Sequence, residues 1–300
     1  MTRTRVAPVL VTGATGRVGR VVIDLLIDAG VPVRALIHRS ETAATLPTNV
    51  DVVTGDLTAP ESLDAGLRDV GAVFLVWTAP PTTAPAVIER LATHALRVVF
   101  LSAPHKTPHP FFQQPNPMAV LYADIERRIA AAGLESTIIR PGMFASNASL
   151  WWATAIRTEG VVRWPYGAAE IAPVDDRDVA AVAALTLYQD GHAGGDYVLT
   201  GPDSLSQAEQ VRIIGDVLGR RIGFEELSPD EFRRETEGSW PRPVVDMLLA
   251  AWGATIGRPA FMSSTVSDIL GSPPRSFRQW VTDHAAVFME GPVDNEAETG

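Results

Sequence analysis

The sequence predicts an α/β protein: a doubly wound parallel sheet with a smaller C-terminal α+β lobe. Three observations predict this class. Short apolar segments alternate with helical ones through the first half. A glycine-rich turn joins the first strand to the first helix. The alternation weakens after about residue 142, where aromatic residues gather.

The length of 300 residues exceeds the roughly 100–200 of a usual single domain, which also favours two parts. We predict a first domain over 1–142 and a substrate-binding lobe over 143–290, with 174–190 packing back on the first domain. The polar, acidic residues 291–300 are predicted to be a disordered tail.

The first strand, Val9–Thr12, is a continuous apolar run of the kind that is buried on both faces. A helical pattern follows it and ends at Gly30. Further strands are predicted at Val33–Ile37, Val50–Val53, Val73–Trp77, Val98–Leu101 and Thr137–Ile139, with helices at about 61–67, 84–95 and 118–132. Strands joined through helices form right-handed crossovers, so the sheet is expected to be parallel and to bind ligands at its carboxyl edge.

The second half is less regular. Val174–Leu187 has a helical pattern and Tyr197–Leu199 is predicted to be a strand. Helices are expected at about 206–218, 242–252 and 276–286, separated by turns rich in glycine and proline.

Composition excludes several classes of protein. The chain has no cysteine, which rules out disulfides, thiolate metal sites and cysteine nucleophiles, and its six histidines form no ligand pair. The net charge of −10 and the absence of a Lys/Arg cluster argue against nucleic acid as a partner. No signal region or bilayer-length apolar run is seen. We therefore expect a cytoplasmic protein with no metal and no membrane partner.

The glycine turn carries the main functional signal. Three glycines follow a strand and open a helix, the context in which this motif binds a dinucleotide pyrophosphate at the helix N-terminus. The alternative is a plain glycine-rich turn. The residues expected at the cofactor here are Gly13, Thr15, Gly16, Arg17, Val18 and Gly19.

The end of the second strand selects between the two nicotinamide dinucleotides. An acidic residue there binds the ribose 2′-hydroxyl, whereas basic residues suit a 2′-phosphate. This chain has His38 and Arg39 at that point and no acid before Glu41. With Arg17 in reach, this favours NADP(H), with NAD(H) as the alternative; Arg39 is otherwise a solvated charge.

Residues after the other strands are expected to border the same cofactor. Asp56 follows the third strand and is interpreted either as a hydrogen-bond acceptor for the adenine amino group or as a turn residue that caps the next helix. The remaining candidates are Leu57, Trp77, Thr78, Ser102, Pro141 and Met143.

With these segments in place, the chain resembles the NmrA-like branch of the atypical short-chain dehydrogenases/reductases, which have a Rossmann-like fold. The resemblance reaches about residue 288. It rests on the motifs at 13–19, 33–36, 55–57, 125–126, 139–144, 173–180 and 197–202.

The resemblance implies an NAD(P)-binding fold and leaves three uses open. Some members are quinone or ether reductases. Others sense the dinucleotide and regulate a partner protein without turnover. Others serve aromatic polyketide pathways, reducing a quinone for a partner hydroxylase. The first hypothesis here is an NAD(P)H-dependent reductase of a quinone-like or conjugated aromatic carbonyl; the second is a non-catalytic regulator.

The candidate catalytic residues are Tyr122 and His105. Ordinary short-chain dehydrogenases use Tyr-x-x-x-Lys; here Tyr122 is followed four residues later by Glu126, which would raise the tyrosine pKa. Tyr122 is expected to donate a hydrogen bond to a substrate carbonyl, or else merely to line the sheet edge. His105 follows the fifth strand and is interpreted as a proton donor or a solvated loop residue.

Aromatic residues after the strands suggest a small planar aromatic substrate, because flat rings stack well on them. The alternative is that several of them build the core between the lobes. The candidate substrate-binding residues are Phe111, Phe144, Asn147, Trp151 and Trp164. Asn147 is interpreted either as a hydrogen-bonding partner of a substrate oxygen or as a helix cap.

Overall fold

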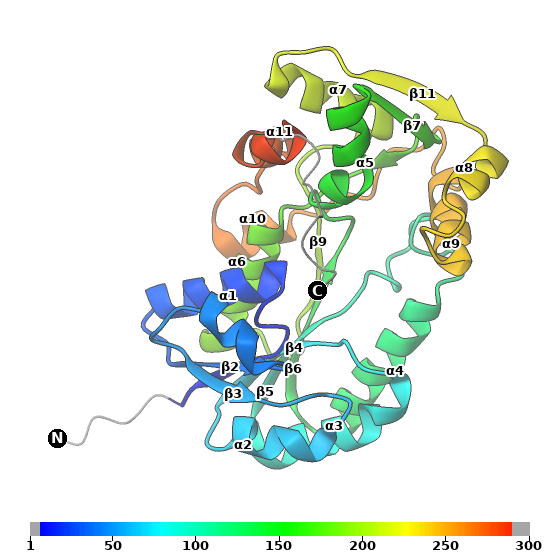
Figure 1. The fold of residues 1–300 in the computed structure, drawn as a ribbon. Helices are drawn as coiled ribbons and strands as arrows, with labels where there is room; N and C mark the ends of the chain where they lie inside the picture. Colours follow the sequence, from blue (N-terminus) through cyan, green and yellow to red (C-terminus); the bar gives the residue numbers. More distant parts are fainter. Residues whose placement is uncertain (1–6, 290–300) are drawn as a thin grey trace, which may run out of the picture.

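The computed structural model describes residues 7–289 and contains a seven-stranded, wholly parallel sheet (Figure 1). Its strand order is β3-β2-β1-β4-β5-β6-β9, in which the direction of winding reverses beside β1. The predicted doubly wound Rossmann-like sheet is confirmed. The strands are β1 (Val9–Val11), β2 (Val33–Ile37), β3 (Asp51–Thr54), β4 (Ala72–Val76), β5 (Arg97–Leu101), β6 (Glu135–Pro141) and β9 (Asp196–Leu199).

Helices cover both faces of this sheet. One face packs against α1 (Arg17–Asp28), α6 (Asp176–Tyr188) and α10 (Thr265–Leu270). The other packs against α2 (Asp64–Leu67), α3 (Ala84–His94) and α4 (Pro117–Ala131). Because apolar cores lie on both faces, the central strands β1 and β4 are continuous apolar runs.

A second lobe lies beyond the carboxyl edge of the sheet (Figure 1). It contains two small sheets, in which β11 pairs parallel to β7 and β10 pairs antiparallel to β8. Its core is rich in aromatic residues, among them Trp152, Trp252 and Phe232. Its elements are α5 (Asn147–Thr158), β7 (Val161–Pro165), β8 (Glu170–Ile171), β10 (Leu205–Ser206), α7 (Gln207–Leu218), β11 (Gly223–Leu227), α8 (Pro229–Glu235), α9 (Arg242–Gly253) and α11 (Phe277–Asp283).

The described part of the chain also contains four short 3₁₀ helices: η1 (Ser40–Thr45), η2 (Pro60–Leu63), η3 (Pro81–Thr83) and η4 (Ala285–Phe288). No helix within 7–289 is long and apolar enough to cross a membrane. The predicted disordered tail at 291–300 lies outside the described residues.

The chain returns to the main sheet more often than the boundary at residue 142 implies. The sequence predicts this return for 174–190, and α6 does pack on α1 and the sheet. In addition, β9 pairs with β6 as the last strand, and α10 packs against α6 and β9. The second lobe is therefore built from the segments between these returns.

Candidate active site

The glycine turn is shaped by close contacts that only glycine permits. Gly13 has a φ of +61°, in the left-handed region, and a side chain there would lie 3.0 Å from Val76. A Cβ atom at Gly19 would overlap the carbonyl oxygen of Gly13. The turn closes through a 2.9 Å hydrogen bond from the Gly16 amide to the Gly13 carbonyl. Helix α1 therefore starts directly against the end of β1.

The N-terminus of α1 is left free of protein partners for its first amides. Its N-cap residue is Gly16, no side chain caps it, and no acidic residue stands in its first turn. Free amides at a helix N-terminus attract a phosphate. The cradle therefore fits a dinucleotide pyrophosphate. Thr15 and Arg17 are exposed beside it, whereas the side chain of Val18 is buried in the core and offers only its backbone.

The basic residues after β2 are exposed as expected, but one of them has a partner. His38 Nε2 lies 3.0 Å from Asp56 Oδ2. Asp56 Oδ1 accepts a 2.8 Å hydrogen bond from the Thr58 amide, the main cause of the lowered pKa of this carboxyl group. Asp56 is thus a turn residue, as its second interpretation has it, but it does not cap the next helix, whose N-cap residue is Ala59.

The other residues predicted to border the cofactor divide into buried and exposed ones. Leu57 and Trp77 are buried in the core, and the Trp77 indole donates to the Ala79 carbonyl at 2.6 Å. Thr78 is exposed. Arg17 Nε lies 3.5 Å from Asp176 Oδ1 at the start of α6.

A cavity of about 300 Å³ lies at the carboxyl ends of β4, β5 and β6, between the sheet and the second lobe. Its volume is at the lower end of the range of small-molecule sites. Its walls are mostly apolar. It is lined by Val76, Leu101, Ser102, Ala103, Pro104, His105, Phe111, Phe112, Gln114, Asn116, Tyr122, Pro141, Gly142, Met143, Phe144, Met247, Leu248 and Ala251.

Tyr122 places its phenol in the wall of this cavity. It lies on α4, and its ring packs edge-on against Phe100 of β5. Burial raises the pKa of the phenol, so the hydroxyl stays protonated at neutral pH and can donate a hydrogen bond. Glu126 contributes nothing to this rise, because its carboxylate points to other partners.

Glu126 is the centre of a buried ion network beneath the cavity. Its carboxylate accepts hydrogen bonds from Arg140 at 2.6 and 2.8 Å, from Ser102 at 2.5 Å and from Lys106 at 2.8 Å. Arg140 also pairs with Asp196 of β9. Burial alone would raise the pKa of Glu126, but the hydrogen bonds outweigh it and lower the pKa to about 2.

His105 lines the cavity, yet both its ring nitrogens face the ion network. Nδ1 lies 3.5 Å from an Arg140 guanidinium nitrogen, and Nε2 lies 3.8 Å from Glu126. Nε2 is buried without a hydrogen-bond partner. Burial lowers the pKa of this imidazole, which keeps it neutral at pH 7. In this arrangement the His105 ring is part of the cavity wall, and Tyr122 is better placed than His105 to donate a proton to a substrate.

The candidate substrate residues separate into two groups. Phe111 and Phe144 line the cavity, together with Ser102, Pro141 and Met143 from the cofactor set. Asn147, Trp151 and Trp164 are outside its lining. Trp151 and Trp164 stack at 5.6 Å in the core of the second lobe, and the Trp164 indole donates to Gln207 at 2.7 Å. This is the core role that the sequence left as the alternative.

Some lining residues are not predicted by the sequence. Gln114 and Asn116 follow Phe111 and Phe112, and that aromatic pair is the local signal that points to this loop. Met247, Leu248 and Ala251 come from α9, more than 100 residues further along the chain, and nothing local marks them. No group of three or more potential metal ligands is found within 7–289.

Comparison with known proteins agrees with this geometry. Residues 13–189 match the model of the NAD(P)H-binding family. The chain is 38% identical, over 93% of its length and 99% of the relative's, to the (4-alkanoyl-5-oxo-2,5-dihydrofuran-3-yl)methyl phosphate reductase of Streptomyces griseus. It is 28% identical to the NAD(P)H azoreductase of Xenophilus azovorans, over 93% of this chain and 99% of that one.

Among solved structures, an NADPH-dependent quinone oxidoreductase from Escherichia coli in complex with NADPH superposes with a TM-score of 0.79. The two chains are 23% identical, and the match covers 92% of this chain and 99% of the other. At that identity the match supports the fold. The resemblance to the NmrA-like branch agrees with a 25% match, over 88% of this chain and 91% of the other, to an NmrA-like oxidoreductase of Aspergillus flavus. The family match and the relatives show that the chain belongs to the NAD(P)H-binding family and is an NAD(P)H-dependent oxidoreductase.

Proposed function

We propose that this oxidoreductase reduces a small, uncharged, planar substrate in which the reacting double bond is conjugated to a carbonyl group, as in a quinone. The observation that carries the proposal is the mostly apolar cavity of about 300 Å³ at the carboxyl edge of the sheet, with the Tyr122 phenol in its wall. The glycine turn lies at the same edge, after β1.

The chain's own residues supply position and one proton. NADPH, when bound along the glycine turn and this edge, supplies a hydride. The apolar walls orient the substrate and exclude water. Tyr122 holds a hydrogen bond to the carbonyl oxygen and gives it a proton as the hydride adds to the conjugated system. The reduced product leaves, and the phenol regains its proton from solvent.

The absence of the usual lysine near Tyr122 favours a conjugated hydride acceptor as the substrate. An unactivated ketone needs a strong acid, whereas a quinone accepts a hydride with only weak assistance. The Streptomyces griseus relative is named for a ring that carries oxo and alkanoyl groups, and the Escherichia coli protein is named for quinones. These names support the same class of electron-poor substrate.

The basic groups Arg17, His38 and Arg39 support NADPH as the preferred cofactor, since each is exposed near the glycine turn or the end of β2. His38 Nε2 lies 3.0 Å from the carboxylate of Asp56, the acidic group in contact with these basic residues. Service to a hydroxylase in an aromatic polyketide pathway and a regulatory partner stay predictions from the resemblance. A cytoplasmic location stays a prediction from the sequence, which shows no signal region and no bilayer-length apolar run.

The test is a substrate panel with NADPH and NADH, read by loss of nicotinamide absorbance and by product analysis. It compares naphthoquinones, anthraquinones, an acyl-butenolide with and without a phosphate, an azo dye and cyclohexanone. We expect turnover of conjugated carbonyl compounds, NADPH above NADH, and no reduction of cyclohexanone. If the ketone or the azo dye is reduced while every quinone and butenolide is not, the proposed substrate class is wrong.

A further inference from the structure

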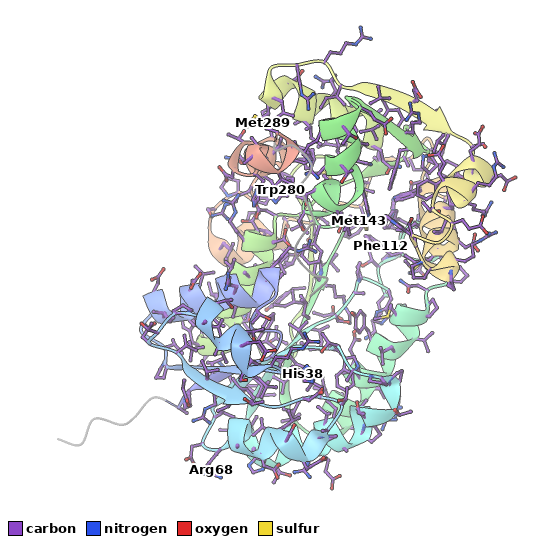
Figure 2. All side chains as sticks on the ribbon, viewed as in Figure 1. His38, Arg68, Phe112, Met143, Trp280 and Met289 are labelled. Carbon is purple, nitrogen blue, oxygen red and sulfur yellow. The ribbon has the colours of Figure 1, made fainter. Side chains whose placement is uncertain are left out.

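The cavity shares a wall with a second, much smaller cavity. Phe111, Phe112, Gly142 and Met143 line both spaces. The second cavity has a volume of about 10 Å³, room for about one water molecule. Figure 2 labels Phe112 and Met143 between the sheet and the second lobe. The larger cavity is therefore closed at this wall, and the space behind it is nearly filled.

The rings of this wall are held in place by their neighbours. Phe112 packs edge-on against Phe111, with ring centroids 5.1 Å apart, and against Phe261 at 6.3 Å. The Gln113 side chain donates to the His105 and Thr107 carbonyls at 3.1 and 2.7 Å, which bonds the loop to itself. The wall is thus a fixed boundary of the cavity.

The second cavity, behind this wall, is lined by both apolar and polar residues. Of the seven residues that line it apart from the wall, three are polar, His109, Glu170 and Thr200, and four are apolar: Ile171, Ala172, Ala260 and Phe261. One carboxylate, Glu170, also borders it and accepts a 2.5 Å hydrogen bond from Ser204. The space itself is too small for a hydrocarbon tail, which could enter only through the volume that the Phe112 ring now occupies. A tail that ends in a carboxylate would be disfavoured beside Glu170, because like charges repel in a partly buried site.

We propose that Phe112 is a specificity-determining residue, whose ring shuts the cavity against substrates that carry a long apolar tail. The inference rests on the proposed function, because the tail is taken to be attached to a conjugated carbonyl ring. With Phe112 in place the cavity fits ring-sized substrates. Without the ring, the two cavities join and a tail can extend toward Phe261.

The experiment measures kcat/KM for NADPH-dependent reduction of 1,4-naphthoquinones with no tail, an ethyl tail and an octyl tail. In the parent protein kcat/KM is expected to fall about tenfold or more from no tail to octyl. In Phe112→Ala the octyl compound should gain about tenfold relative to the parent. A tail that ends in a carboxylate should be rejected by both proteins.

Phe224→Ala is the matched control, because Phe224 lies on β11 and lines neither cavity. It should keep the parent's preference for short tails. The inference is overturned if the parent has equal kcat/KM values for the octyl and the unsubstituted compound, since the tail then extends through the opening of the cavity to solvent. It is also overturned if Phe112→Ala retains the parent's tail dependence.

A failure of the proposed function would look different: neither protein would oxidise NADPH with any quinone. In that case the Kd of each quinone is measured instead, from the quenching of tryptophan fluorescence in the presence of NADP⁺. A tail-length penalty in Kd that Phe112→Ala removes supports the role of Phe112 as a wall. Equal Kd values across the series in the parent overturn it.

Discussion

Position 126 shows how one residue changes what a helix face can do. Ordinary short-chain dehydrogenases carry a lysine four residues after the tyrosine. Here Glu126 occupies that place and binds Arg140, Ser102 and Lys106. A carboxylate cannot stabilise a tyrosinate, so the helix presents a neutral phenol to the cavity. The charge of Glu126 stays in the ion network beneath the cavity.

The phenol is the residue on which turnover should depend. Tyr122→Phe removes the hydroxyl and keeps the ring that packs on Phe100. We expect kcat to fall by roughly 10²-fold, the lower end for loss of a general acid, with little change in NADPH affinity. Steady-state kinetics measure both. Tyr188→Phe, on the half-exposed Tyr188 at the end of α6, should be neutral; an unchanged kcat for Tyr122→Phe would remove this residue from the reaction.

The charge at Glu126 should matter mainly for stability. Arg140 is only 1% exposed, so Glu126→Gln leaves a buried guanidinium partly uncompensated, at a cost on the order of 3 kcal/mol. Glu135→Gln is the matched control, since it removes a carboxylate that pairs with Arg97 at the surface and should cost less than about 1 kcal/mol. Urea unfolding at neutral pH measures the free energy of unfolding of the parent and of the two variants.

The Glu126–Arg140 pair also predicts how the free energy of unfolding depends on pH. The pKa of Glu126 is lowered from its ordinary 4.5 to about 2, so its contribution is present above about pH 4.5 and is lost as the pH falls toward 2. The stability gap between the parent and Glu126→Gln should therefore narrow over that interval. A gap that stays constant down to pH 3 would show that the ionised carboxylate is not the source of the effect.

At the scale of elements, the sequence predicts what local pattern determines. The strands of the main sheet and the glycine turn follow from apolar runs and from residues with special backbone freedom. Helix α5 was missed because its N-cap Ser146 makes no capping bond and its Trp-Trp pair breaks a simple polar and apolar pattern. The ion network joins α4, β6 and β9, and no local signal links them.

The glycine turn gives the prediction that belongs to this scale. Gly19→Ala forces a methyl group into the Gly13 carbonyl, which pushes α1 away from β1. We expect the Kd for NADPH to rise by about tenfold or more, since overpacking costs about 1–3 kcal/mol. Gly30→Ala controls for backbone strain: its φ is +70° but nothing lies near, so it should lower stability and leave Kd unchanged. Fluorescence titration reads the Kd values.

At the scale of the whole molecule, the start of α6 joins the cofactor cradle to the second lobe. Asp176 accepts a 3.0 Å hydrogen bond from Ser146, next to α5, and lies 3.5 Å from Arg17 of the glycine turn. Asp178 binds Arg275, in the segment before α11. Cofactor binding and the placement of the second lobe therefore meet at one short stretch of chain.

Asp176 and a bound phosphate would compete for the same guanidinium of Arg17. Burial raises the pKa of Asp176, because its charge is less stable in the fold than in water; removing that charge in Asp176→Asn should therefore cost little stability at neutral pH. With that charge removed, we expect NADPH to bind several-fold more tightly, and the gain to shrink at high salt because Arg17 is exposed. Asp178→Asn, equally buried but paired with Arg275, should leave the affinity unchanged. If Asp176→Asn weakens binding at both salt concentrations, this carboxylate supports the cofactor rather than competing with it.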